Sequence, residues 1–246
     1  MFVRVDVSDE SAVRAMVDTV LAQFGRVDIL VNDAGIFIQH LVEDMPVQDW
    51  DRVLSVNLRG TYLRTRVLLG QILERDPGGI INIASQLGQI GGAEVAQHAA
   101  SKTAVSGFTK SLAREVSGRG VLVNAIAPGP IHTPLLGGET EAWRRATLAD
   151  LPIRRFGKVS EVTPTALLLA SDDGSYPLRH VDVQLRRCPR SRAALLGARA
   201  SRRILGAVLG ELVADGDLDA RETTDIARRI LGATAWDLNG LTSALS

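Results

Sequence analysis

Val27-Asp28-Ile29-Leu30-Val31 runs directly into Asn32-Asp33-Ala34-Gly35, so a short apolar segment is followed at once by small and polar residues. An apolar run of this length indicates a buried strand, and the polar turn marks its carboxyl end. A helix is predicted between Ser8, a suitable N-cap, and Gly25, a suitable C-cap. Further strands are predicted at residues 2–7, 80–83 and 121–127, and further helices at about 48–75 and 101–117. Such an alternation predicts an α/β fold whose parallel sheet is covered on both faces.

Small and polar residues follow each predicted strand. They are Asn32 to Gly35, Ala84-Ser85, and residues 128–133. In open parallel sheets, ligands bind outside the carboxyl ends of the strands, so these residues form the candidate site. Asn57 also draws attention, because an amide in the middle of a helical pattern is not favoured by propensity. Taken singly, each feature is equally typical of an ordinary turn or a local hydrogen bond.

In their order and spacing, these features resemble the short-chain dehydrogenase/reductase family from Asp6 to about Tyr176. The resemblance rests on the following motifs: Asp6-Val7 after a strand, the Asn-Asn-Ala-Gly type turn seen as Asn32 to Gly35, Asn57, Ser85, Lys102, residues 124–129 with Thr133, and Arg155-Phe156-Gly157. It implies a Rossmann-like doubly wound parallel sheet and hydride transfer between NAD or NADP and a small carbonyl or alcohol. It also implies homodimers or homotetramers that pack through the helices at about 48–75 and 101–117.

The resemblance carries roles onto individual residues. Ser85 would hydrogen-bond the substrate oxygen, Lys102 would hold the nicotinamide ribose and lower the pKa of the proton donor, and Asn57 would hold a relay water. The implied cofactor contacts are Asp6 and Val7 at the adenine, Asn32, Ala34 and Gly35 on the adenosine side, and Pro128, Gly129, Ile131 and Thr133 at the nicotinamide. The segment 133–155 would close over the substrate, which the sequence does not identify.

One residue departs from the catalytic pattern. The family's Tyr-x-x-x-Lys is His98-x-x-x-Lys102 here. A phenol whose pKa is lowered by a neighbouring cation can protonate an alkoxide near neutral pH. An imidazole beside Lys102 should stay neutral and donate poorly, so we expect a loss of about 10²–10⁴-fold in rate. The alternative is that His98 acts as an acid at mildly acidic pH.

A second departure concerns the cofactor phosphates. The family's Gly-x-x-x-Gly-x-Gly turn does not precede Asp6, and no other glycine-rich segment replaces it. That turn places backbone N–H groups and a helix N-terminus on the pyrophosphate, so cofactor binding is expected to be weak. The sheet is expected to lack its first two strands, which would leave a gap of roughly 10 Å or an exposed edge. Met1 is then interpreted as an internal methionine of a longer reading frame, or the chain as a decayed gene product.

The resemblance ends after Tyr176, where the family's last strand is expected to be missing. Residues 1–185 are predicted to form the partial Rossmann domain and 186–246 a helical-hairpin tail. Apolar residues recur at helical spacing in this tail: Ile204, Leu205, Val208, Leu209 and Leu212, then Ile226, Ile230 and Leu231. Asp215, Asp217 and Asp219 do not make a calcium loop, because Ala220 and Ile226 stand where glycine and glutamate are needed.

The composition of the chain disfavours several classes of binding partner and site. The 28 basic and 28 acidic residues balance, and no basic run alternates with aromatic residues, which gives no support for nucleic acid as a partner. A single cysteine and the absence of a signal or of a long apolar run predict a cytoplasmic protein without membrane contact. The scattered histidines predict no metal site. A Ser85–His98 hydrolase pair is disfavoured, because the nucleophile elbow is missing.

Two functional hypotheses therefore remain. The first is an NAD(P)-dependent oxidoreductase impaired at His98 and at the phosphate turn. The second is a non-catalytic family member that acts by protein association.

Overall fold

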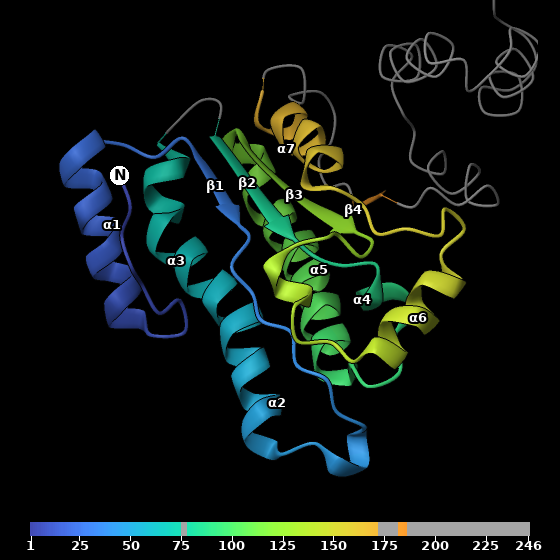
Figure 1. Ribbon diagram of the computed structural model, residues 1–246. Coiled ribbons are helices and arrows are strands. Elements are labelled where there is room, and N and C mark those ends of the chain that lie inside the picture. Colours follow the sequence, from blue (N-terminus) through green and yellow to red (C-terminus); the bar gives the residue numbers. More distant parts are fainter. Residues whose placement is uncertain (75–77, 172–181, 186–246) are drawn as a thin grey trace, which may run out of the picture. The chain divides into compact units, whose positions relative to one another are not determined.

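The computed structural model describes residues 1–74, 78–171 and 182–185, and the predicted helical tail lies outside them. Four parallel strands form the sheet, in the order β1 (Ile29–Asn32), β2 (Gly78–Ile83), β3 (Val121–Pro128) and β4 (Asp182–Leu185) (Figure 1). The predicted α/β architecture with a parallel sheet is confirmed. The strand predicted at 27–31 begins two residues later, and the other two extend past their predicted bounds.

Two strand predictions were wrong. Residues 2–7 do not form a strand, since the described sheet ends at β1 and offers this segment no neighbouring strand. Its last residue, Val7, is buried against Gly60 of a later helix instead. The last strand, predicted to be missing, is present as β4 and pairs with β3, Ala125 lying opposite Asp182. Backbone groups alone make this ladder, so the pairing does not require the family's terminal sequence.

The first helix, α1 (Glu10–Phe24), follows its predicted course with a different cap. The carboxylate of Asp9 accepts hydrogen bonds from the Ser11 and Ala12 N–H groups, as an N-cap does. Ser8, the predicted cap, instead donates through its N–H and its hydroxyl to Asp6 Oδ1. Gly25 ends the helix in the left-handed region at φ 74°, as predicted.

The long helical segment predicted at about 48–75 is three elements in succession. They are α2 (Val47–Leu54), a π-helical turn η2 (Ser55–Arg59) and α3 (Gly60–Leu73). The helix predicted at 101–117 begins five residues earlier as α5 (Ala96–Val116), which places His98 in its first turn. The shorter elements are η1 (Val42–Asp44), α4 (Leu87–Ile90), η3 (Ser117–Arg119), η4 (Pro134–Leu136), α6 (Glu141–Asp150), η5 (Val159–Glu161) and α7 (Thr163–Ala170).

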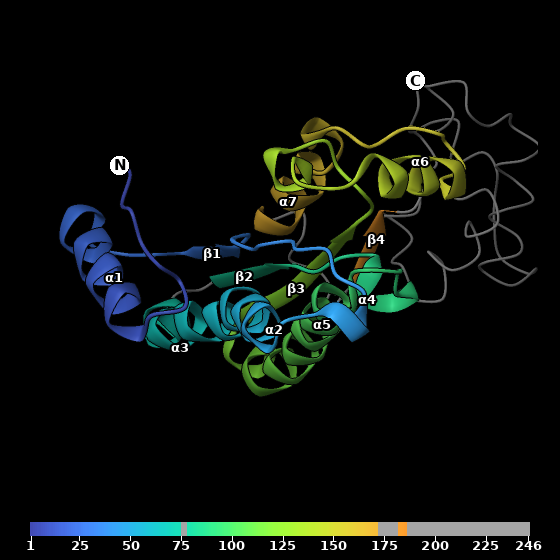
Figure 2. The ribbon, with the colours of Figure 1, turned by 60° about the horizontal axis from the view of Figure 1, so that its bottom comes forward.

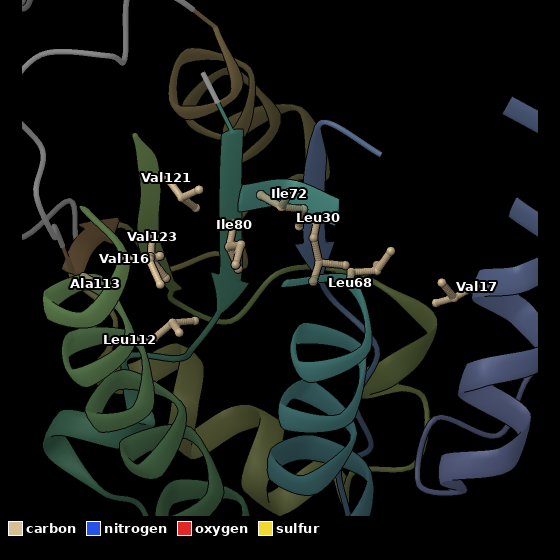
Figure 3. Packing of buried hydrophobic residues seen from close by; sticks show 10 residues of the cluster. All are labelled: Val17, Leu30, Leu68, Ile72, Ile80, Leu112, Ala113, Val116, Val121 and Val123. Carbon is tan, nitrogen blue, oxygen red and sulfur yellow. The ribbon is translucent and has the colours of Figure 1, made fainter. Parts of the chain in front are cut away.

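Helices cover both faces of the sheet, with α3 and α5 on one side and α7 on the other (Figure 2). Adjacent strand residues therefore enter different cores. Ile80 packs in the α3–α5 core with residues such as Leu68 and Leu112 (Figure 3), whereas Ile81 packs with Leu169 of α7. This two-sided burial explains why the strands read as near-continuous apolar runs.

The edge strand β1 is less completely covered than the strands inside the sheet. Leu30 is buried against the α3–α5 core, whereas Ile29 and Val31 are 37% and 47% exposed. Because side chains alternate across a strand, these two residues share the face opposite α3. Among the described residues, no helix is both long and apolar enough to span a bilayer.

Candidate functional site

The site is organised around the backbone of Ile36, in the loop that leaves β1. Asn57 Oδ1 accepts from the Ile36 N–H at 2.8 Å, and Asn57 Nδ2 donates to the Ile36 carbonyl at 3.1 Å. The same Nδ2 donates to Ser101 Oγ of α5 at 3.1 Å. Asn57 is buried and lies in the π-helical turn, a conformation often found at functional sites. The amide singled out in the sequence therefore ties the loop, η2 and α5 together.

The beginning of α5 and the turn just before it hold the same loop at alternate residues. Gln97 Nε2 donates to the Ile38 carbonyl at 2.8 Å, and the His40 N–H donates to the Glu94 carbonyl at 2.9 Å. His98 Nδ1 lies 3.3 Å from the Ile36 carbonyl oxygen. The loop is therefore fixed along one side by α5 and at its start by Asn57.

His98 is held neutral by its surroundings. Burial, and secondarily the positive charge of Lys102, lower the pKa of its imidazole to about 4. A carbonyl oxygen only accepts hydrogen bonds, so the contact with Ile36 places the proton on Nδ1 and leaves the lone pair on Nε2. At neutral pH the free nitrogen of His98 is an acceptor with no proton to give.

Lys102 lies one helical turn beyond His98 and is also buried. Its Nζ donates to the Ile83 carbonyl, at the end of β2, at 2.6 Å. Burial lowers the pKa of its ammonium to about 8, with Asp33 acting in the opposite direction and Arg64 in the same direction. Gly35 lies against this group, because a Cβ there would be 3.7 Å from Nζ and 3.2 Å from Asn57 Oδ1. Any side chain at Gly35 would crowd both polar groups.

Ser85 follows β2 and is placed by packing against α5. Its Oγ accepts from the Leu87 N–H at 3.1 Å, and its carbonyl accepts from the Gly88 N–H. Gly88 touches α5 so closely that a Cβ would lie 2.8 Å from the Thr103 nitrogen. The half-buried Ser85 hydroxyl keeps its own proton available for a ligand, because it acts only as an acceptor in its contact with Leu87.

The segment after β3 lies next to Ser85. The Gln86 N–H donates to the Pro128 carbonyl at 2.9 Å, and a Cβ on Gly129 would be 3.3 Å from Gln86 Oε1. Ile131 forms an isolated parallel bridge with Gly157. Thr133 is half-buried and begins the turn into η4. These residues form a continuous rim at the carboxyl ends of β2 and β3.

Asn32 belongs to a buried row of polar side chains beneath this rim. Its Nδ2 donates to Asn82 Oδ1 at 2.8 Å and to Thr65 Oγ1 at 3.1 Å. Asn82 Nδ2 in turn donates to Thr109 Oγ1 of α5 at 2.9 Å. We call Thr65, Asn32, Asn82 and Thr109 the amide row. The Asn32 side chain is therefore hydrogen-bonded inside the protein, whereas Ala34 and Gly35 after it remain partly accessible to solvent.

The segment predicted to close over the substrate, 133–155, packs against the Ile36 loop. The Trp143 ring of α6 lies 5.6 Å from that of Phe37, and Phe37 lies 5.1 Å from the His98 ring in an edge-on arrangement. The Thr140 N–H donates to Gln39 Oε1 at 2.8 Å. A row of three rings thus connects α6 to His98.

The remaining predicted cofactor contacts are Asp6 and Val7. Val7 packs against Gly60, where a Cβ would be 2.9 Å from Val7 Cγ2. The exposed Asp6 carboxylate is occupied by Ser8, whose hydrogen bonds lower the pKa of Asp6. Among residues 1–74 and 78–171, no group of three or more acidic, histidine or cysteine side chains could hold a metal ion.

A family model described as enoyl-(acyl carrier protein) reductase matches residues 1–177 of the chain. The chain belongs to the short-chain dehydrogenase/reductase family. It is 40% identical over 171 residues to a 3-oxoacyl-[acyl-carrier-protein] reductase of Thermotoga maritima, covering 70% of each protein. A reductase of the same description from Staphylococcus aureus is 37% identical over 174 residues, covering 71% of each.

Solved structures support the same assignment. A 3-ketoacyl-(acyl-carrier-protein) reductase from Brucella melitensis, complexed with NADH, aligns with a TM-score of 0.70 and 31% identity, over 75% of this chain and 76% of that one. Aldohexose dehydrogenase from Thermoplasma acidophilum, in ligand-free form, aligns with a TM-score of 0.67 and 27% identity, over 76% of this chain and 79% of that one. The Rossmann-like fold inferred from the sequence is thereby confirmed.

Membership in the short-chain dehydrogenase/reductase family implies a nicotinamide dinucleotide, and the site residues fit one end of it. Lys102 Nζ lies at the end of β2 with Gly35 leaving space beside it, and Pro128, Gly129, Ile131 and Thr133 follow β3 and are partly buried; the family resemblance assigns these residues to the nicotinamide and its ribose. The described residues contain no Gly-x-x-x-Gly-x-Gly turn for the pyrophosphate. The fit therefore covers the nicotinamide half of such a cofactor.

Several residues of the site had not been singled out from the sequence. Gln97 and the Phe37–Trp143 contact gave no signal, because a glutamine and two scattered aromatic residues are common anywhere. Arg64 had a readable signal: it lies seven residues after Asn57, two helical turns away and on the same side of the helix. A charged residue at that position should have indicated a buried cation.

Proposed function

We propose that this member of the short-chain dehydrogenase/reductase family is an NAD(P)-dependent oxidoreductase acting on a small carbonyl or alcohol, with turnover slowed at His98. The convergence of Asn57, Ser85 and Lys102 on the carboxyl ends of β1 and β2 carries this proposal. These side chains come from three separate segments, yet hydrogen bonds and close packing hold Asn57 at the loop after β1, Lys102 at the end of β2 and Ser85 in the loop that follows it.

Each residue would have a distinct task. Ser85 would donate its free hydroxyl proton to the substrate oxygen, which favours negative charge on that atom. Lys102 would hold the ribose of the nicotinamide half from its anchored position on Ile83. Asn57 would support a relay water beside Lys102, as the family resemblance implies. When bound, the nicotinamide supplies or takes the hydride.

The neutral imidazole of His98 would limit the rate at which a carbonyl substrate is reduced. The imidazole carries its proton on Nδ1, directed at Ile36, and presents a lone pair at Nε2. A carbonyl reduced to an alkoxide needs a proton donor at this point, and neutral His98 lacks one. A pKa of about 4 also argues against the alternative in which His98 works as an acid at mildly acidic pH. Reduction would then take its proton from water, at a correspondingly lower rate.

The reductases of acyl-carrier-protein thioesters among the relatives make a 3-oxoacyl thioester a suitable first substrate. We also propose a cytoplasmic homodimer or homotetramer that packs through α2, α3 and α5.

Calorimetric titration of the purified chain with NADH, and separately with NADPH, tests the proposal. Binding of either dinucleotide that is lost in Lys102→Met supports the oxidoreductase. Lys110→Met, on the same helix two turns away, is the matched control and should bind as the parent chain does. A folded chain that binds neither dinucleotide contradicts the proposal and favours the non-catalytic alternative, in which the chain acts by association.

A further inference from the structure

The helix α6 is attached to the rest of the protein by few side chains. None of its residues is fully buried, and none of the described helices and strands packs extensively against it. It meets the Ile36 loop, residues 36–40, at two points. The Thr140 N–H, at its N-cap, donates to Gln39 Oε1 at 2.8 Å. The ring of Trp143 lies 5.6 Å from that of Phe37. These two contacts fix where α6 lies on the loop.

The segment that contains α6 is also held together from within. Arg144 Nη1 donates to Glu139 Oε1 at 2.7 Å, and the Arg144 guanidinium lies 5.0 Å from the centre of the Phe156 ring. The Glu139 side chain is only 2% exposed. Residues 139–156 therefore form a unit whose internal contacts do not depend on the Ile36 loop.

The docked position of α6 leaves two buried polar atoms without partners. They are Gln39 Nε2 and Glu139 Oε2, neither of which has a hydrogen bond among the described residues. A buried donor or acceptor without a partner is costly, and both atoms would regain hydrogen bonds to water if the helix left the loop. The docked and undocked positions of α6 are therefore closer in free energy than its contacts alone would make them.

The Phe37 ring also contacts the imidazole of His98. The two ring centres lie 5.1 Å apart with 70° between their planes, an edge-on arrangement. His98 is 5% exposed, and its Nδ1 lies 3.3 Å from the carbonyl oxygen of Ile36, the residue before Phe37. A turn of the imidazole would break that contact. The Phe37 ring therefore lies where it restricts the imidazole.

We propose that Phe37 is a positioning residue for His98 and that α6 controls it. With Trp143 docked on it, the Phe37 ring keeps the imidazole turned so that Nδ1 faces the Ile36 carbonyl. When α6 leaves the loop, Phe37 loses the support of Trp143 and the imidazole is free to turn. The segment 133–155 thus acts on His98 through the row of rings, in addition to closing over a ligand.

The consequence for ligand binding rests on the function proposed above. An imidazole whose Nδ1 donates to a carbonyl presents Nε2 as an acceptor. The hydroxyl of an alcohol can donate to this nitrogen, whereas the oxygen of a carbonyl only accepts and cannot. Docking of α6 would therefore favour the alcohol form of a substrate over its carbonyl form.

The tautomer of His98 tests the inference without cofactor or substrate. The chain has four histidines, so long-range ¹H–¹⁵N NMR spectra give four imidazole patterns, and His98→Phe identifies the one of interest. At pH 8 this imidazole is neutral, because its pKa is about 4. The parent chain should carry the proton on Nδ1, since the Ile36 carbonyl accepts a hydrogen bond there.

Two substitutions that undock α6 should change this tautomer. Trp143→Ala should shift the ratio toward the Nε2–H form about two- to tenfold, the range that an aromatic contact contributes to an equilibrium constant. Gln39→Leu removes the acceptor of the Thr140 N–H and should act in the same direction. The conservative variants Trp143→Phe and Gln39→Glu keep a ring and an acceptor, so both should stay close to the parent ratio.

Trp50→Ala on α2 is the matched control, because this tryptophan is also partly exposed, at 37%. It should leave the tautomer ratio unchanged. The inference is overturned when Trp143→Ala has no effect, or when Trp50→Ala has an equal one. A shift in Phe37→Ala but not in Trp143→Ala also overturns it, since Phe37 would then act without α6. Trp143 lies on a helix with no fully buried residue, so its variant should fold even where Phe37→Ala does not.

This test and the titration with NADH and NADPH have separate outcomes. A chain whose tautomer ratio shifts as expected but which binds neither dinucleotide supports the role of Phe37 and contradicts the oxidoreductase. A chain that binds a dinucleotide while Trp143→Ala leaves the ratio unchanged supports the oxidoreductase and contradicts the role of Phe37.

Discussion

Replacing His98 with tyrosine should restore the missing proton donor. The pKa of His98 is about 4, so roughly one imidazole in a thousand carries the second proton at neutral pH. A positioned general acid is typically worth about 10²–10⁴-fold in rate. We therefore expect His98→Tyr to raise kcat for carbonyl reduction about 10³-fold, with a smaller effect on KM.

The larger ring must be accommodated beside Phe37. His98 is 5% exposed, and the Phe37 ring, which contacts Trp143 of α6, lies 5.1 Å from the imidazole. A tyrosine displaces this row of rings slightly, and that displacement alone could alter activity. His98→Phe imposes nearly the same packing without a hydroxyl, so it is the matched control. Circular dichroism melting of both variants should show similar stabilities.

The assay is reduced-cofactor oxidation with a 3-oxoacyl thioester, run with NADH and with NADPH on the parent chain and both variants. The reasoning requires His98→Tyr to exceed His98→Phe by at least about tenfold. Equal rates in the two variants would refute the view that a proton donor is what the site lacks. A chain that binds cofactor but gains nothing from tyrosine would refute it too.

Three further outcomes are expected. The pKa of His98 in the folded chain lies below its unfolded value of 6.5, so the folded state favours the neutral imidazole. The free energy of unfolding should therefore be highest above pH 6.5 and fall by about 3 kcal/mol as the pH drops toward 4. Urea titrations of His98→Phe should not show this dependence. Asn57→Ala removes three hydrogen bonds and should cost about 3 kcal/mol by the same measurement, whereas a cost below about 0.5 would contradict its tying role. Gly88→Ala should lower the melting temperature, since its Cβ would meet the Thr103 nitrogen at 2.8 Å, while Gly107→Ala, with open space around it, should not.

The sequence predicted the interior of the fold well because burial dictates composition there. The strands β1, β2 and β3 are apolar runs; β2 and β3 are packed between two layers of helices, and β1 is buried on its α3 side. The prediction failed at residues 2–7, whose apolar character indicates a strand, because the sheet of the described residues has no neighbouring strand to pair with this segment. A strand forms only when a second segment pairs with it by hydrogen bonds, so the composition of one segment alone does not predict the pairing.

The sequence predicted several residues of the candidate site but not the hydrogen bonds between them. Asn57 was singled out because an amide is out of place in a helix, and it proved to bond the Ile36 backbone. Ile36 itself gave no signal, since its contribution is a carbonyl and an N–H that every residue carries.

The amide row has a consequence for how the sheet assembles. The stretch Ile29-Leu30-Val31 is uniformly apolar, so hydrophobicity alone distinguishes poorly between pairing registers of β1 on β2. Asn32 lies opposite Asn82, and a shift by one residue would turn its amide toward the open face of the sheet, away from Thr65. A shift by two would leave Asn82 without its partner in the interior. The hydrogen bonds of these two neutral side chains thus stabilise the observed register of β1 on β2 over shifts of one or two residues.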